Sequence, residues 1–130
     1  MSELSGASAA SVSSATAEAA EVRRVCERFH AAIELIGGRW TGAILRAVFT
    51  GSHRFAHIRA AVPGLSDTML AQRLRTLEEH GLLERRVGPS GPNQVEYRFT
   101  AKGEELEPVI DAVIAWSHRW IQLPDRTTDT

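Results

Sequence analysis

Residues 65–82 read LSDTMLAQRLRTLEEHGL, and this stretch decides the fold. Ser66 is a favoured residue for a helix N-cap, and Asp67 follows in the first turn, where the helix dipole favours an acid. Gly81 stands where a glycine commonly ends a helix. The apolar residues that recur at helical spacing between these signals are Leu70, Leu74 and Leu77. The stretch therefore predicts a helix with one buried face.

The opposite face of this predicted helix is polar and suits the major groove of DNA. At about 100° per residue, Gln72 and Arg75 point away from the leucines, and these side chains can read adenine and guanine. Arg73 lies at the edge of the apolar stripe, where we expect it to extend along the surface or to bond a phosphate. Free N–H groups at the helix start can hold a second phosphate. The DNA-contacting residues predicted on this helix are Ser66, Thr68, Ala71, Gln72, Arg73, Arg75 and Thr76.

The elements around this helix complete a known plan. Further helices are predicted over residues 21–36, 39–49, 54–62 and 101–121. Strands are predicted over residues 82–87 and 94–99, with a turn rich in Gly and Pro between them. The fold class is therefore mainly α with a small β-hairpin, which is a winged helix-turn-helix with terminal helices available for dimerisation.

The predicted hairpin is the wing of this fold. Arg85 and Arg86 on its first strand and Arg98 on its second strand are placed to contact the DNA backbone or the minor groove. The glycines and prolines of the tip allow a close approach to a phosphate. The alternative interpretation of the hairpin is a plain surface hairpin with solvated charges. The alternative interpretation of the helix is an ordinary amphipathic helix with a solvated polar face.

Length and charge fit one domain with a basic middle. The chain has 130 residues, and we expect the domain to span residues 21–122. Residues 1–20 are rich in Ala and Ser and predict a disordered tail, and residues 123–130 predict a flexible one. The net charge is −1, but residues 39–102 carry ten basic and five acidic residues. Such a basic segment can meet phosphates.

Cysteine usage and hydropathy indicate the compartment. A single cysteine excludes a disulfide within one chain. The N-terminus lacks a charged region followed by an apolar run, and no apolar stretch approaches the roughly 18–20 residues of a membrane span. The sequence therefore predicts a cytoplasmic protein with no signal peptide and no membrane partner.

Several separated motifs resemble the HxlR family of regulators. They include IGGRW at residues 36–40, LSDTMLAQRL at residues 65–74 and YRFT at residues 97–100, followed by Lys102 and Gly103. The resemblance covers roughly residues 26–120, with the motifs in the right order. It implies a bacterial, homodimeric winged-helix regulator that acts as a repressor or an activator and that often responds to electrophiles or oxidants.

The same resemblance implies a sensor cysteine just before the first helix, and Cys26 is the candidate. Members of the family usually have a proline after this cysteine, whereas Glu27 follows here, and the spacing to Trp40 is one residue longer. Arg23 and His30 are expected in its helical neighbourhood, where positive charge would favour the thiolate. The alternative is a small cysteine buried in a dimer interface.

Two apolar stripes on the terminal helices predict a homodimer. One stripe of a helix can cover the core of its own domain and leave another for a partner. The alternative is that all of these residues serve the core of a monomer. The predicted dimerisation residues are Val22, Val25, Phe29, Val109, Val113, Trp116 and Trp120.

Other function classes have less support in the sequence. His53 and His57 have a spacing that can bind a metal, but neither an HExxH nor a CxxC motif accompanies them. Cys26 and His30 lack a third residue that would orient them for hydrolysis. We therefore expect neither an enzyme nor a metal or cofactor. Two alternatives stay open: a winged-helix module that binds protein instead of DNA, and a regulator that senses a small ligand between its terminal helices.

Overall fold

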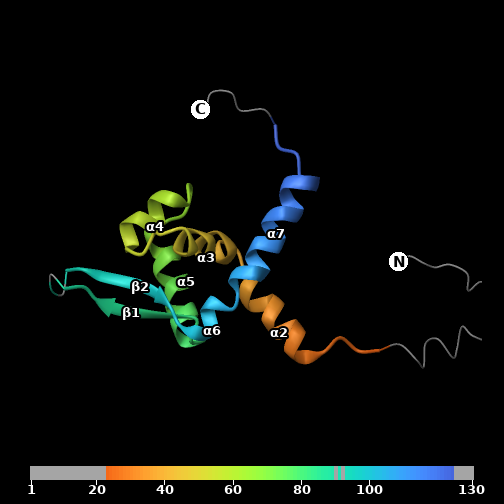
Figure 1. Cartoon of the computed structure of the whole chain (residues 1–130), viewed down its shortest axis with the longest axis horizontal. Coiled ribbons are helices and arrows are strands. Elements are labelled where there is room, and N and C mark those ends of the chain that lie inside the picture. The colour runs from red at the N-terminus through yellow and green to blue at the C-terminus, as the bar shows by residue number, and fades with distance from the viewer. Residues whose placement is uncertain (1–22, 90, 92, 125–130) are drawn as a thin grey trace, which may run out of the picture. The chain divides into compact units, whose positions relative to one another are not determined.

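The computed structural model describes residues 23–89, 91 and 93–124. The predicted tail over residues 1–20 and the predicted dimerisation residue Val22 lie outside the described residues. The described elements are α2 (Glu27–Ile36), α3 (Thr41–Phe49), α4 (Phe55–Ala61), α5 (Asp67–Glu79), β1 (Leu83–Val87), β2 (Val95–Phe99), α6 (Ala101–Glu104) and α7 (Glu107–Trp120). This order, shown in Figure 1, confirms the predicted fold class.

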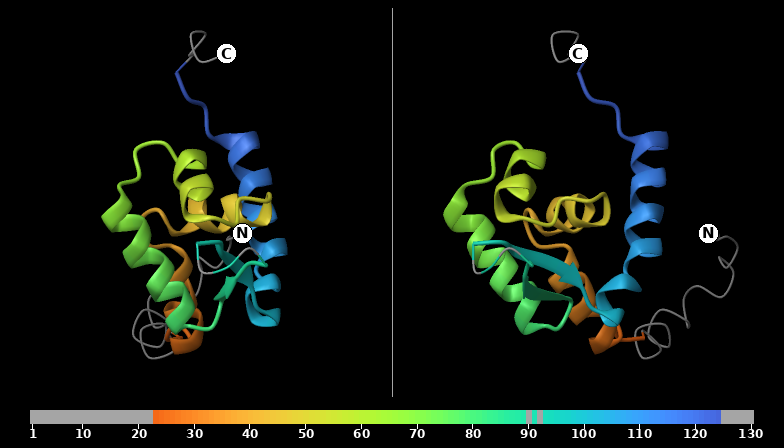
Figure 2. Two further views of the ribbon diagram at one scale, coloured as in Figure 1. Left: turned by 90° about the vertical axis from the view of Figure 1, so that its left-hand side faces the viewer. Right: turned by 60° about the vertical axis from the view of Figure 1, so that its left-hand side comes forward.

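The chain divides between Glu34 and Leu35 into two compact units. The second unit holds the helix-turn-helix, the hairpin and α7. Its helices α3, α4 and α5 gather around one core, and α7 runs beside α3 (Figures 1 and 2). The largest fully buried side chains of this core are Ile44, Leu45, Ile58, Leu70, Leu74, Leu77 and Val48. The stripe of Leu70, Leu74 and Leu77 predicted from the sequence is therefore confirmed as the buried face of α5.

The hairpin is a two-stranded antiparallel sheet. Its register pairs Leu83 with Phe99, Arg85 with Tyr97, and Val87 with Val95. Successive side chains of a strand point to opposite faces, so these residues share one face and their neighbours in the strand share the other. The backbone N–H of Tyr97 also donates to the carbonyl of His53 over 2.7 Å, which ties the segment before α4 to β2.

The first described helix begins later than the predicted residue 21. Residues 23–26 have no regular secondary structure, and α2 starts at Glu27. Arg23 and Arg24 would place positive charge at the positive end of the helix dipole, whereas Glu27 places a carboxylate there. Similarly, α3 begins at Thr41 and not at Arg39, because Trp40 has a left-handed backbone with a φ of 73°.

The predicted last helix is broken into two. Helix α6 ends at Glu104 and α7 begins at Glu107. Pro108 explains the break, because a proline lacks an N–H and its ring clashes with the carbonyl four residues earlier, which here is that of Glu104. Within α7 the inward stripe comprises Ile110, which is buried, and Ile114, which is half-buried. Val113 is exposed and lies off this stripe.

Candidate nucleic-acid interface

Helix α5 is fixed at its start by a cap and an ion pair. The Ser66 hydroxyl accepts a hydrogen bond from the Met69 backbone N–H over 3.1 Å, as the N-cap prediction requires. Asp67 in the first turn pairs with Arg59 of α4, with 2.5 Å between the Asp67 Oδ1 and Arg59 Nε atoms. This pair joins α4 to α5, and both side chains are too exposed for a large stabilisation.

The end of α5 is fixed by residues from beyond the hairpin. The Lys102 ammonium donates to the carbonyl of His80, the C-cap residue, over 2.7 Å. The Thr100 hydroxyl donates to the carbonyl of Gly81 over 2.5 Å. Gly81 has a φ of +75°, which a glycine adopts without strain. Sequence reasoning missed Thr100 and Lys102 in this role, since only the fold brings them to the end of α5.

The outward face of α5 is available to a ligand. Thr68, Gln72 and Arg75 are exposed, and Ala71 and Thr76 are half-buried beside them. The Thr76 hydroxyl donates back to the Gln72 carbonyl over 3.2 Å. Within the part of the chain that the structure describes, the side chains of Gln72 and Arg75 have no hydrogen-bond or ion-pair partner. These two side chains can therefore bond base edges without first breaking an internal contact.

Arg73 has a contact within the protein. Its Nε donates to the carbonyl of Arg39 over 2.9 Å, which ties α5 to the turn before α3. The Arg39 guanidinium in turn lies 5.2 Å from the centre of the Trp40 ring, within the range of a cation–π interaction. The guanidinium of Arg73 therefore links two segments of the protein and is half-buried.

Arg85 lies beside α5. The hairpin register places it on the same face as Tyr97, and a groove of about 320 Å³ runs between this face and α5. Arg75 and Arg85 both line the groove, together with Ala71, Glu78 and Tyr97. Sequence reasoning did not single out Glu78 and Tyr97. Helical spacing from Arg75 could have indicated Glu78, but Tyr97 depends on the hairpin register.

Arg86 and Arg98 lie on the other face of the hairpin. The register there pairs Glu84 with Arg98 and Arg86 with Glu96. Arg86 Nη2 lies 2.5 Å from Glu84 Oε2, and Arg98 Nη2 lies 3.0 Å from Glu96 Oε1. The hydrogen bond from Arg98 lowers the pKa of the Glu96 carboxyl below its ordinary value. The structure thus brings Arg85 to α5, but it does not bring Arg86 or Arg98 into that groove.

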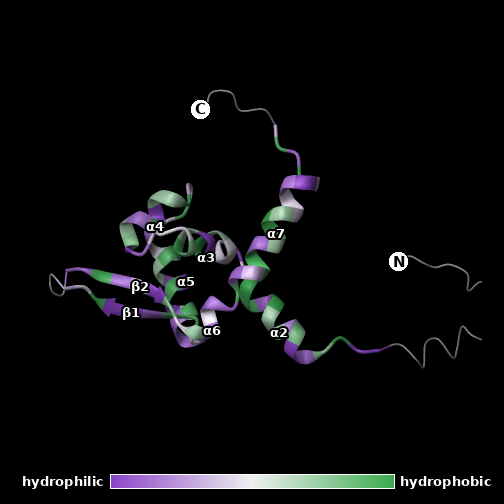
Figure 3. Ribbon diagram, in the orientation of Figure 1, coloured by the Kyte–Doolittle hydropathy of each residue, from purple (hydrophilic) through white to green (hydrophobic). Residues whose placement is uncertain are grey.

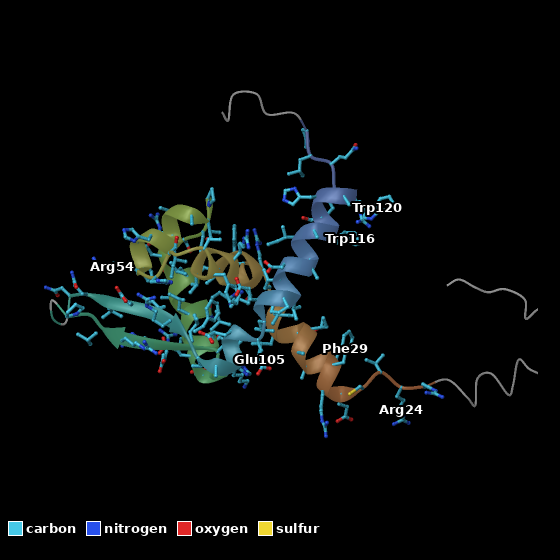
Figure 4. The ribbon with its side chains drawn as sticks, viewed as in Figure 1. Arg24, Phe29, Arg54, Glu105, Trp116 and Trp120 are labelled. Atoms are coloured by element: carbon cyan, nitrogen blue, oxygen red, sulfur yellow. The ribbon has the colours of Figure 1, made fainter. Side chains whose placement is uncertain are left out.

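The predicted dimerisation residues within the described chain are exposed. On α7 they follow one face, and the exposed fraction is 58% for Trp116 and 64% for Trp120. Figure 4 shows both tryptophans on the side of α7 that faces away from α3, and Figure 3 shows hydrophobic colour along this helix. Val25 and Phe29 of the first unit are exposed as well.

Cys26 lies just before α2 and is exposed. Its carbonyl accepts the N–H of His30 over 2.9 Å, so Cys26 occupies the N-cap position of this helix. The expected helical neighbourhood with Arg23 is wrong, because residues 23–26 are not helical. Cys26 therefore lies at the N-terminal end of α2.

Comparison with known proteins decides the family. Residues 35–125 match the family described as HxlR-like helix-turn-helix. The chain is 38% identical over 97 residues to the uncharacterized HTH-type transcriptional regulator YvaP of Bacillus subtilis, which covers 75% of this chain and 90% of YvaP. The chain belongs to the HxlR family. This HxlR-family protein is also 36% identical over 101 residues to the HTH-type transcriptional regulator YodB of B. subtilis, covering 78% of this chain and 90% of YodB.

Solved structures agree with this assignment. The reduced form of YodB superimposes with a TM-score of 0.63 at 34% identity, covering 78% of this chain and all of that one. The redox regulator HypR in its reduced form gives a TM-score of 0.66 at 31% identity, covering 72% of this chain and 92% of that one. This HxlR-family member is therefore a helix-turn-helix transcription regulator.

The described residues offer neither a cluster of metal-ligating side chains nor a membrane-spanning helix. Among residues 23–89, 91 and 93–124, no three His, Cys, Asp or Glu side chains gather as a metal would require. Over the same described ranges, none of the helices has the length and apolar character needed to cross a bilayer.

Proposed function

We propose that this HxlR-family regulator binds an inverted-repeat operator in double-stranded DNA as a homodimer, in the cytoplasm and without a catalytic role. The observation that carries the proposal is the outward face of α5, where Gln72 and Arg75 are exposed and have no internal partner among the described residues. The leucine stripe on the opposite side holds this helix in the core. A helix anchored in this way can enter the major groove with its polar face.

The residues of the interface have different roles in this proposal. Gln72 and Arg75 read base edges, and Thr68, Ala71 and Thr76 flank them. Ser66 and the first N–H groups of α5 hold a phosphate. Arg85 contributes the main wing contact because it shares a groove with Arg75. Arg86 and Arg98 contribute less, since each is paired with a glutamate on the other face.

The test measures DNA binding by single alanine variants of the interface residues. We would first footprint the wild-type protein on the DNA upstream of its own gene, and then measure Kd on the protected fragment by fluorescence anisotropy. Loss of a bidentate base contact costs about 1–3 kcal/mol, so Gln72→Ala and Arg75→Ala should each weaken binding by about tenfold to a hundredfold. Arg85→Ala should weaken binding on all sequences alike.

Arg86→Ala is the control for these variants, because it removes the same charge from the opposite face of the hairpin. It should change Kd by less than about threefold. If the Gln72 and Arg75 variants bound DNA as tightly as the wild type, α5 would not be the reading helix. The fold would then serve as a module that binds another protein.

The exposed stripe of α7 supports the homodimer in this proposal. Val109, Val113, Trp116 and Trp120 follow one another at helical spacing on the exposed face. Aromatic residues of this size dominate the energetics of protein interfaces. A twofold axis through such an interface would place two copies of α5 on half-sites about 34–36 Å apart.

We further propose that Cys26 makes the regulator responsive to oxidants or electrophiles. YodB has been solved in quinone-bound and diamide-treated forms, and HypR in reduced and oxidised forms. Cys26 is exposed and stands at the start of α2, so a reagent in solution can reach its sulfur. Treatment with diamide or a quinone should change the affinity of the wild type for its operator, and Cys26→Ser should abolish the change. A response that survives in Cys26→Ser would instead indicate a small ligand.

A further inference from the structure

A second cavity is lined by Arg86 and Arg98, which lie on the opposite face of the hairpin from Arg85, together with Phe99 at the end of β2. It has a volume of about 420 Å³ and is formed by the end of α3, His53, the hairpin, the last residue of α6 and the first residue of α7. Its lining includes no residue of α5. The volume is within the range of cavities that bind small molecules in proteins, roughly 300–1,000 Å³. The cavity is therefore a candidate ligand site separate from the DNA interface.

One wall of this cavity is aromatic. The rings of Phe49 and Phe99 stack with 3.9 Å between their centroids and 17° between their planes. Both residues are half-buried and line the cavity beside Val48. Such a pair offers a flat apolar surface, and the negative face of an aromatic ring also attracts cations.

Each arginine that lines the cavity is paired with a neighbouring carboxylate. Arg86 and Arg98 each bond one carboxylate oxygen of a neighbouring glutamate through both Nε and Nη2. Burial, together with the charge of Arg98, lowers the pKa of His53 below its ordinary value, so this imidazole is neutral at pH 7. The positive charge of the lining therefore has local partners.

The remaining charges of the lining are negative. Glu104 of α6 and Glu107 of α7 both line the cavity, and neither forms an ion pair within the described chain. Glu105 lies between them in sequence and is exposed, but it does not line the cavity (Figure 4). The cavity thus combines an aromatic wall with two carboxylates that lack a counter-charge.

We propose that this cavity binds a small organic cation with a flat apolar part. The apolar part packs against Phe49 and Phe99, and the cationic group lies near Glu104 and Glu107. A ligand in this place contacts the hairpin and the start of α7 at the same time. The proposal rests on the cavity alone, so it does not depend on the DNA-binding proposal.

The test is direct binding of a matched pair of probes, measured by isothermal titration calorimetry on the full chain. The cationic probe is benzyltrimethylammonium, and the anionic probe of similar shape is phenylmethanesulfonate. We expect saturable binding of the cation with a Kd of about 1 mM or tighter, and no saturable binding of the anion.

Variants then locate the site. The double variant Glu104→Gln and Glu107→Gln should weaken cation binding at least tenfold, whereas Glu105→Gln should leave it unchanged. Phe49→Leu should also weaken it, and circular dichroism verifies that each variant is folded. The proposal is overturned by an absence of saturable cation binding, by equal binding of the anion, or by equal effects of Glu105→Gln and the double variant. DNA binding is not measured here, so failure of either proposal is recognised separately.

Discussion

At the scale of single residues, Gly103 shows how closely α6 approaches the segment between α5 and β1. Gly103 is buried, and a Cβ added there would lie 2.1 Å from the carbonyl oxygen of Leu82 and 2.7 Å from Cδ1 of Phe99. A backbone oxygen cannot yield to such a contact without moving the chain. Only glycine fits at this position.

We predict that Gly103→Ala lowers the free energy of unfolding by about 2–3 kcal/mol, because it overpacks a backbone contact. Urea unfolding followed by circular dichroism measures the change. Gly42→Ala is the matched control: a Cβ there meets nothing within 4 Å, and Gly42 lies inside α3. Since alanine favours a helix over glycine, Gly42→Ala should stabilise the protein by up to about 1 kcal/mol. Equal effects of the two substitutions would contradict the close approach.

Residue-level expectations were most successful where the cause is local. The Ser66 cap, the leucine stripe and the Gly81 stop depend on residues within one helix, so the sequence was enough to predict them. The bond from Arg73 to the Arg39 carbonyl joins residues 34 positions apart, and helical spacing alone could not indicate it.

At the scale of elements, the end of α5 depends on the segment that follows the hairpin. The Thr100 hydroxyl donates to the Gly81 carbonyl and accepts from the Gly103 N–H. A single side chain therefore caps α6 and holds the turn that ends α5. Helix α5 is in this way tied to the segment that leads into α7.

We predict that Thr100→Val lowers the free energy of unfolding by about 2 kcal/mol, because both hydrogen bonds are lost in a half-buried place. Thermal or urea unfolding measures it. Thr50→Val is the comparison, since the Thr50 hydroxyl bonds only carbonyls of its own helix. It should cost under about 0.5 kcal/mol. If Thr100→Val lowered the free energy of unfolding no more than Thr50→Val does, the two hydrogen bonds of Thr100 would contribute nothing to stability.

The order of the elements was predictable, but two of their boundaries were not. Apolar spacing continues across residues 101–121, so periodicity alone favoured one helix, while Pro108 breaks it. In the hairpin, the two strands were predicted, but the relation of each arginine to α5 was not. Alternation along one strand separates Arg85 from Arg86, and only the tertiary fold shows which of them faces α5.

At the scale of the whole molecule, binding to an inverted-repeat operator requires two chains. The exposed stripe on α7 includes two tryptophans, and an exposed apolar stripe of this kind supports the proposed homodimer. The sequence alone could not predict what covers this stripe, because apolar residues at helical spacing fit a dimer interface and the core of one domain equally well.

We predict that Trp116→Glu converts a dimer into a monomer, because it places a charge at the centre of an apolar interface. Sedimentation velocity at micromolar concentration measures the mass. Ala115→Glu introduces the same charge on a neighbouring exposed position of α7, away from the tryptophan stripe, and should stay dimeric. A wild type that sediments as one chain at all concentrations would contradict the proposed dimer.

We propose above that the polar face of α5 and the wing bind duplex DNA through bases and phosphates. The most direct test is the Kd for the upstream DNA fragment, measured by fluorescence anisotropy at salt concentrations from about 50 to 200 mM. Because bound counterions are released when cationic side chains meet phosphates, a dimer with about six to ten such contacts should lose at least about a thousandfold in affinity over this range. An affinity that stays flat as salt rises would contradict the account.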